Sequence, residues 1–252
     1  MARAARTTTA LLLLATAGAT LTGCGSEEEA AAPAPTQRPV VATDVSGVER
    51  VIRCEKEVLL SDDVETVFPA ADRNSAFRKI LAYTLYESTW NEHLLNADTP
   101  HVVEDFRRAG LYLDPETTAD WDGQVSRALA GDPGAIAQVN DLAFFQLRDA
   151  EGDTTPATGE VVSERRCRQV AFDVSRTSGS PRLKLTFDVS ADVAIAKEDG
   201  SIVQLPTSKN ITYTLASDVD LGGDWYITSY YGDTRTGEAA RAAIEDGPVQ
   251  SM

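Results

Sequence analysis

Histidine titrates near neutrality when its surroundings do not perturb it, and the sequence holds two, His93 and His101, eight residues apart. Glu92 or Glu104 would orient them as an acid–base pair in a cavity. No serine or cysteine in a recognisable nucleophile setting accompanies them, and neither an HExxH nor a GxSxG motif occurs. We favour the alternative, in which both are partly exposed or capping residues at helix ends, and predict no catalytic residue.

A second candidate site lies around Cys167, which Arg165, Arg166 and Arg168 flank in an otherwise acidic protein. In a strand, Arg166 and Arg168 share one face, where they would hold the carboxylate or phosphate of an anionic ligand. Tyr230 is the third residue proposed for such a pocket. The alternative is that the arginines block edge-to-edge aggregation and pair with local acids, and that Tyr230 belongs to the core.

The composition is that of an ordinary globular protein with a strong negative charge. Of the 252 residues, 42% are hydrophobic and 25% charged, which excludes a mostly disordered or collagen-like chain. The formal net charge of −16 repels nucleic-acid phosphates and anionic membrane surfaces. Two His and three Cys are too few for a multi-histidine metal site or a disulfide-dense scaffold. We therefore predict no nucleic-acid partner, no metal site and no cofactor.

The first 24 residues are a basic start, an apolar run and a cysteine. The run, residues 10–21, is shorter than the ~20 residues of a membrane helix and is typical of a signal peptide. It ends in LTGC, which resembles a bacterial lipobox. The resemblance implies that residues 1–23 are a lipoprotein signal peptide and that acyl chains on Cys24 anchor the protein on the extracytoplasmic side of the cell membrane. The alternative is a cysteine that follows an ordinary signal peptide by chance.

The remaining chain divides into three parts. Residues 24–46 lack hydrophobic periodicity and contain three consecutive glutamates and several prolines, which predicts a disordered tether. One α+β domain is predicted at 47–235, followed by a loose tail at 236–252 with a possible short helix. No stretch after the signal peptide is apolar for long enough to span a membrane.

Cys54 and Cys167 are the cysteines left over if Cys24 is lipidated. An extracytoplasmic address permits a disulfide, and an even pair favours one. The bridge would join the first segment of the domain to its first long strand. The alternative is two buried thiols that never meet. A catalytic cysteine is not favoured, because neither residue has a nearby histidine or helix N-terminus that would favour its thiolate.

Between residues 61 and 149 the apolar side chains recur at helical spacing. The longest helix is predicted at 74–96, after a shorter one capped by Ser61. Three start signals that contain proline, at Pro100, Pro115 and Pro133, predict further helices. This half of the domain is therefore predicted to be helical.

From residue 159 to 232 the period changes to two, most clearly at 183–195. Asp199-Gly200 predicts a hairpin turn, and Pro206 places its part of the returning strand at an edge or a bulge. Gly222-Gly223 predicts the next turn. The segments form a four-stranded antiparallel meander after the helical half, so the predicted fold class is α+β.

This element order, with a last strand that contains Trp-x-Ile-x-x-Tyr (Trp225, Ile227, Tyr230), resembles the cone-shaped NTF2-like fold, which includes small envelope proteins associated with Mce lipid-import systems. The resemblance implies a concave sheet around a ligand pocket, and some members of that fold are isomerases or dehydratases that use Asp or His with Tyr. A separate helical subdomain packed on a sheet is the alternative.

Three functions remain open at this stage. We favour a non-catalytic module, anchored through Cys24, that binds or positions another envelope protein. The alternative is a module that binds a small apolar, lipid or anionic ligand in the concavity of the sheet. The third is an enzyme that uses His93 or His101 with a carboxylate.

Overall fold

The computed structural model describes residues 37–44, 46–55, 58–95, 100–146, 148–149, 152–153, 155–157, 161–177, 179–197, 199–218 and 224–245. All of them fall within the unit Pro35–Met252. Cys24, most of the predicted tether and the Gly222-Gly223 turn lie outside these residues. Within the described ranges, no helix has both the length and the apolar character needed to cross a membrane.

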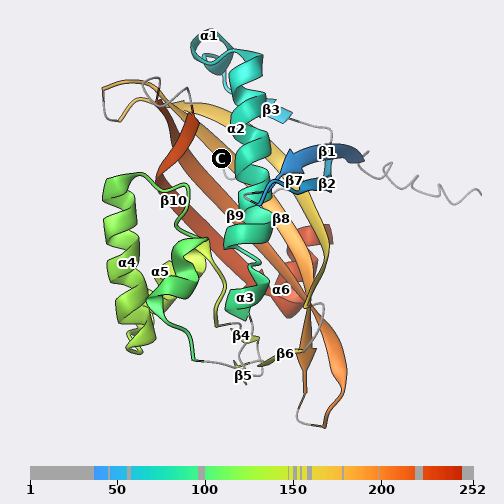
Figure 1. Ribbon diagram of the computed structural model, residues 1–252. Coiled ribbons are helices and arrows are strands. Elements are labelled where there is room, and N and C mark those ends of the chain that lie inside the picture. Colours follow the sequence, from blue (N-terminus) through green and yellow to red (C-terminus); the bar gives the residue numbers. More distant parts are fainter. Residues whose placement is uncertain are drawn as a thin grey trace, which may run out of the picture. The chain divides into compact units, whose positions relative to one another are not determined.

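Four long antiparallel strands pair in chain order, as the alternating pattern predicts (Figure 1). They are β7 (Val162–Ser175), β8 (Arg182–Ala196), β9 (Ile202–Asp218) and β10 (Asp224–Thr236). β10 pairs with β9 only from Thr207 onward, so Pro206 lies where β9 has β8 as its strand partner. The predicted edge position of Pro206 is confirmed.

The α+β class is confirmed, but the sheet is larger than the predicted four-stranded meander. β1 (Gln37–Thr43) and β2 (Glu49–Glu55) form a hairpin, and β2 and β3 (Val58–Leu60) run parallel to β7. β6 (Thr155–Pro156) pairs with β8, while β4 (Arg148–Asp149) and β5 (Gly152–Asp153) pair separately. The sheet is therefore mixed, with the order β1-β2-β7-β8-β9-β10 along its main path.

Both predicted domain boundaries need correction. The segment predicted as a tether up to residue 46 contains β1, whose Val40 and Ala42 are buried. Pro39 hides this strand in the sequence, although proline is compatible with the edge position that β1 occupies. At the other end, the possible short helix exists as α6 (Gly237–Glu245), and its Ala240 is buried. The folded part of the chain therefore extends beyond 47–235 on both sides.

The predicted helix at 74–96 is divided into α2 (Ala70–Ala82), the π-helix η1 (Tyr83–Ser88) and α3 (Glu92–Leu95). α1 (Val64–Val67) begins after Asp63 rather than after Ser61. The segment after Pro100 forms only a short 3-10 helix, η2 (Val103–Arg107). The break into η1 has no counterpart in the apolar spacing, which continues through it.

Two helices begin where their proline signals predict. α4 (Pro115–Leu129) follows Asp114, whose carboxylate accepts a hydrogen bond from the backbone N–H of Thr117. α5 (Pro133–Leu142) follows Asp132, which accepts from two N–H groups of the first turn. Aspartate at the N-cap and proline at the first helical position satisfy the free end of a helix locally, which is why these starts are visible in the sequence.

The sheet has an inner face that α2 and η1 cover. Phe77 of α2 packs edge-on against Phe172 and Phe187, and Tyr83 of η1 packs against Tyr213. All of these side chains are buried. Side chains therefore fill the space between α2 and the sheet, where the NTF2-like resemblance would place a ligand.

Candidate functional site

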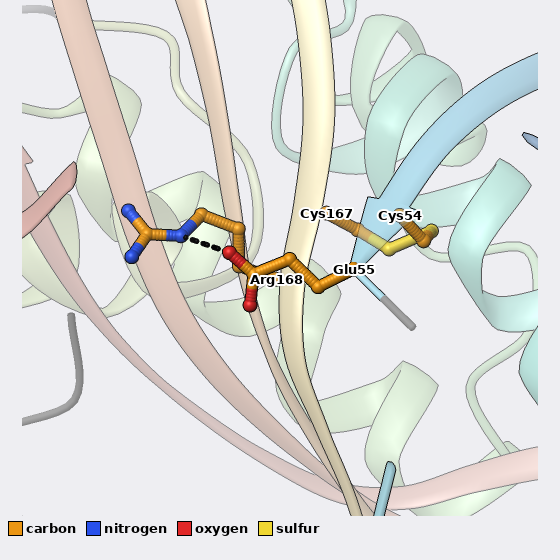
Figure 2. The surroundings of a disulfide bond; sticks show 4 residues. All are labelled: Cys54, Glu55, Cys167 and Arg168. Carbon is orange, nitrogen blue, oxygen red and sulfur yellow. Dashed lines mark hydrogen bonds and ion pairs between the residues drawn. A yellow bond between two sulfur atoms is a disulfide. The ribbon is translucent and has the colours of Figure 1, made fainter. Parts of the chain in front are cut away.

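Cys54 and Cys167 form the predicted disulfide, which joins β2 to β7 (Figure 2). The two residues lie opposite each other in the parallel strand pair, with their Cα atoms 4.6 Å apart. Both are fully buried in the core. The bridge fastens the β1–β2 hairpin to the long strands, so the role of these cysteines is structural.

Arg166 and Arg168 share the outer face of β7, as predicted, but both are paired within the protein. Arg166 Nη2 lies 2.6 Å from Glu164 Oε2. Arg168 Nε lies 3.0 Å from Glu55 Oε1 (Figure 2), and its Nη1 donates to backbone carbonyls in the last turn of α6. A cation at this position satisfies the free carbonyls of a helix C-terminus. Arg168 therefore holds α6 on the sheet.

Tyr230 lies on the inner face, away from the two arginines. It pairs across the sheet with the buried Tyr213 and packs edge-on against Trp121 of α4. Burial raises the pKa of Tyr230 to about 12. A bulge between Ile227 and Ser229 shifts the alternation of β10 by one residue and turns Tyr230 inward. The structure thus separates the three residues predicted to share one ligand pocket.

His93 and His101 do come together, through Asp105, which the sequence analysis did not single out. His93 Nε2 lies 3.0 Å from Asp105 Oδ1, and His101 Nδ1 lies 3.7 Å from Oδ2. The hydrogen bond from His93 is the largest cause that lowers the pKa of Asp105. In the described part of the chain, no three His, Cys, Asp or Glu side chains are arranged to hold a metal ion. The cluster links α3 to η2, and the i,i+4 spacing of His101 and Asp105 was its signal in the sequence.

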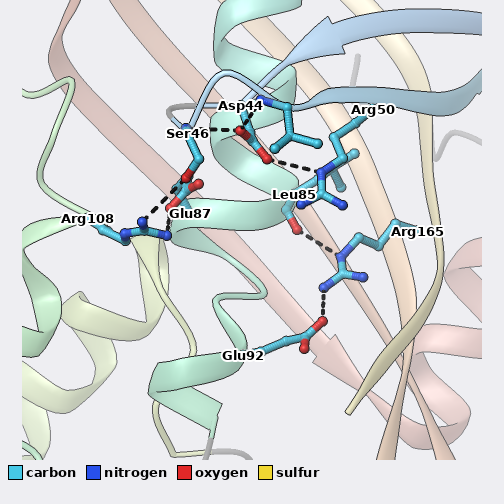
Figure 3. A network of polar contacts seen from close by, with 9 residues as sticks. Asp44, Ser46, Arg50, Leu85, Glu87, Glu92, Arg108 and Arg165 are labelled. Atoms are coloured by element: carbon cyan, nitrogen blue, oxygen red, sulfur yellow. Dashed lines mark hydrogen bonds and ion pairs between the residues drawn. The ribbon is translucent and has the colours of Figure 1, made fainter. Parts of the chain in front are cut away.

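A network of arginines and carboxylates surrounds η1 (Figure 3). Glu87 is buried, which raises its pKa, while Arg108 Nη1 at 3.2 Å acts in the opposite direction. Burial also disfavours the charge on Asp44, but the backbone N–H groups of Val48 and Ser46 and the side chain of Arg50 hold its pKa below the usual value. Arg108 reaches on to Ser46 Oγ at 3.4 Å. The network joins the β1–β2 hairpin to η1.

Arg165 extends this network to β7. Its Nη2 lies 2.7 Å from Glu92 Oε1, and its Nε donates to the carbonyl of Leu85 (Figure 3). The ring of Tyr86 lies beside the guanidinium groups of both Arg50 and Arg165, 4.8 and 4.7 Å from the ring centroid, close enough for cation–π attraction. Each arginine of the network has a carboxylate partner. The role of the network is therefore to position the β1–β2 hairpin.

A cavity of about 410 Å³ lies between α5 and β10. Apolar and polar residues line it: Pro133, Ile136, Ala137, Asn140, Asp141, Phe144, Gln146, Gly232, Asp233, Thr234 and Thr236. α5 touches the β10 backbone here, because a Cβ atom at Gly232 would overlap the carbonyl oxygen of Asp141. Glycine is therefore needed at this crossing.

Lys209 contacts two residues of the cavity lining, Asn140 and Phe144, and was missed by the sequence analysis. Its Nζ donates to the carbonyl of Asn140 at 2.7 Å and lies 5.1 Å from the centroid of the Phe144 ring. The residue is 1% exposed. Burial lowers the pKa of Lys209 to about 7, and the charge of Asp141 opposes this change. Its signal in the sequence was its place on the inward-facing, apolar side of β9, in alternation with Ile211 and Tyr213.

No family model, curated protein sequence or solved structure matches this chain. Its fold and candidate sites define an α+β domain with a mixed sheet, a disulfide-fastened hairpin at one edge and a cavity beside the last strand.

Proposed function

We propose that this protein is a non-catalytic module of the cell envelope, anchored by lipid on Cys24 at the extracytoplasmic side of the membrane, that binds another envelope protein through its β1–β2 hairpin. The observation that carries the proposal is the exposed apolar surface of the hairpin. Val41 and Val51 lie opposite each other and are 48% and 68% exposed, and Val48 between the strands is 45% exposed. Exposed apolar side chains that gather in one place are typical of interaction sites.

The position of β1 at the edge of the sheet also supports the hairpin as the docking surface. β1 stands at the end of the strand order and pairs with β2 on one side. Within the described residues, no strand pairs with its other side. A strand of a partner protein can hydrogen-bond to such an edge, and the partner's apolar side chains would then cover Val41 and Val51.

The hairpin is also held in place before any partner arrives. The Cys54–Cys167 bridge fixes its base, Arg50 and Asp44 close its turn, and Arg108 contacts both Ser46 and Glu87 of η1. A preorganised surface loses less conformational freedom on binding than a flexible one. This arrangement suits a docking element better than a linker.

The buried disulfide supports the proposed address. Disulfides persist in oxidising compartments outside the cytoplasm, and the lipobox resemblance at Cys24 points to the same side of the membrane. Mass spectrometry of the protein extracted from its own membrane tests the anchor directly. A diacyl or triacyl adduct on Cys24 is expected, and a free or absent Cys24 would contradict it.

Site-specific photocrosslinking of the full-length protein in native membranes tests the docking surface. A photoreactive residue at Val51 should yield one crosslinked partner in a fixed ratio. The matched control is Ile202, which is 62% exposed where β9 begins and should yield none. Val51→Lys should abolish co-purification of that partner, and Ile202→Lys should not. Equal crosslinking from both positions, or none from Val51, would refute the proposed surface.

A further inference from the structure

The cavity between α5 and β10 is separate from the hairpin and supports an inference of its own. Its volume of about 410 Å³ lies in the range of sites that hold small molecules or single side chains. Pro133, Ile136 and Phe144 supply apolar wall, while the polar lining comes mainly from the end of α5 and from β10. The charges around the cavity then determine which class of ligand it can bind.

The carboxylate of Asp141 is the unmatched charge of the cavity. Among the described residues, no donor hydrogen-bonds to it and no basic side chain forms an ion pair with it. Burial raises the pKa of Asp141, Asp233 acts in the same direction and Lys209 opposes both. Asp233 itself is paired with Arg235 at 3.0 Å. A partly buried carboxylate without a donor is costly, so a ligand that donates hydrogen bonds and carries positive charge would relieve it.

Lys209 does not supply that charge. Its ammonium group is directed to the carbonyl of Asn140, and burial lowers its pKa to about 7, so a large share of the side chain is neutral near pH 7. Thr234 Oγ1, also in the lining, is buried without a hydrogen-bond partner among the described residues. Among the described residues of the lining, a carboxylate and a hydroxyl are therefore left unsatisfied, and both can accept a hydrogen bond from a cation.

We propose that this cavity binds an alkylammonium group, with the carboxylate of Asp141 as its counter-ion and Ile136 and Phe144 in contact with its hydrocarbon chain. The group belongs either to a free amine or to a lysine side chain of a peptide. An anionic ligand is disfavoured here, because its charge would face Asp141.

Binding should depend on the protonation of Lys209. The charged group that acts on Lys209 is Asp141 of α5; its neighbours across the sheet, Val189 of β8 and Thr234 of β10, are uncharged. Protonated Lys209 repels the ligand cation, whereas neutral Lys209 does not. The affinity for the amine should therefore rise between pH 6 and 8, and Lys209→Met should remove this dependence while it retains binding.

Calorimetric titration of the full-length protein in detergent tests the proposal. The probes are cadaverine, which carries an ammonium group at each end of a five-carbon chain, 1,5-pentanediol as its neutral analogue and glutarate as its anionic analogue. Cadaverine should bind at least about tenfold more tightly than either analogue, a difference of about 1.4 kcal/mol. Asp141→Asn should cost at least about tenfold of that affinity, and the matched control Asp122→Asn, a charge removed from the exposed side of α4, should leave it unchanged.

A blocked tripeptide, acetyl-Gly-Lys-Gly-amide, distinguishes the two sources of the ligand group. Tighter binding of the tripeptide identifies a peptide lysine, and tighter binding of cadaverine identifies a free amine. The proposal is overturned if 1,5-pentanediol binds as tightly as cadaverine, or if Asp141→Asn, folded by circular dichroism, binds cadaverine unchanged. Loss of pH dependence in folded Lys209→Met tests the site without altering Asp141.

Discussion

Replacing Cys54 and Cys167 together by alanine removes the covalent link between β2 and β7 but leaves the strand pairing intact. The bridge spans a separation of 113 residues, and the chain-entropy model assigns a loop of this length about 5 kcal/mol at 25 °C. The unfolding free energy of a typical domain is about 5–15 kcal/mol. We therefore expect the double variant to lose at least a third of its stability, through a denatured state that gains freedom.

Urea unfolding measures this loss in the oxidised protein, the reduced protein and the double variant. Trp90, Trp121 and Trp225 are all buried, so tryptophan fluorescence reports the unfolding of the core. The free energy extrapolated to water should be compared rather than the midpoint, because the bridge also changes the denatured state and hence the slope. The reduced protein should lose the contribution of the bridge alone, and the double variant should be less stable still by the cost of the two small cavities that alanine leaves.

A difference below about 1 kcal/mol between the oxidised and reduced proteins would refute the reasoning. It would mean that residual structure already restricts the denatured chain without the bridge, so that reduction releases little conformational entropy. Hydrogen exchange of the native protein is a separate test, since the amides of β1 and β2 exchange faster on reduction only if the bridge also protects the hairpin from local opening.

Three further predictions concern single side chains. Burial lowers the pKa of Lys209 to about 7, against 10.5 in the unfolded chain. Between these two pH values the unfolded chain binds more protons than the folded protein, so the free energy of unfolding should rise with pH above 7. Urea unfolding at pH 7, 8 and 9 should show a flatter rise for Lys209→Met. Arg168→Ala should lower the free energy of unfolding by about 2–3 kcal/mol and speed hydrogen exchange in α6. Arg166→Ala removes a more exposed ion pair and should lower it by less than about 1 kcal/mol. Equal losses in the two variants would contradict the capping role of Arg168. Gly232→Ala should destabilise by about 1–3 kcal/mol in thermal unfolding, because its Cβ would overlap Asp141 and Lys209, and an unchanged midpoint would refute the close crossing of α5 and β10.

The elements that the sequence predicts well are those whose determinants are local. The starts of α4 and α5 depend on Asp114 and Asp132, each of which caps the backbone two or three residues away. The long strands are visible because one face of each is buried along most of its length, which forces the apolar residues into strict alternation. No distant contact is needed to see either pattern.

The elements that were missed depend on partners far along the chain. β2 and β3 are strands because β7 pairs with them more than 100 residues later, and their own alternation is too short to be seen. The bulges that alter the faces of β7 and β10 are equally hidden; in β7, Glu164 and Gln169 carry positive φ angles without being glycine. The same limitation separated Tyr230 from the arginines of the predicted pocket.

Two basic side chains cap helix C-termini from opposite faces of the sheet, and the difference between them bears on the cavity. Arg168 caps α6 and is neutralised by Glu55 at 3.0 Å. Lys209 caps α5 but forms no ion pair with any residue that the structure describes, although Asp141 is close enough to influence its pKa. If Lys209 served only to cap α5, an ion pair like that of Arg168 with Glu55 would hold the helix without leaving a buried ammonium group unpaired. Among the described residues Asp141 is left without an ion-pair partner beside the cavity, and the proposed cationic ligand would supply the charge that this carboxylate lacks.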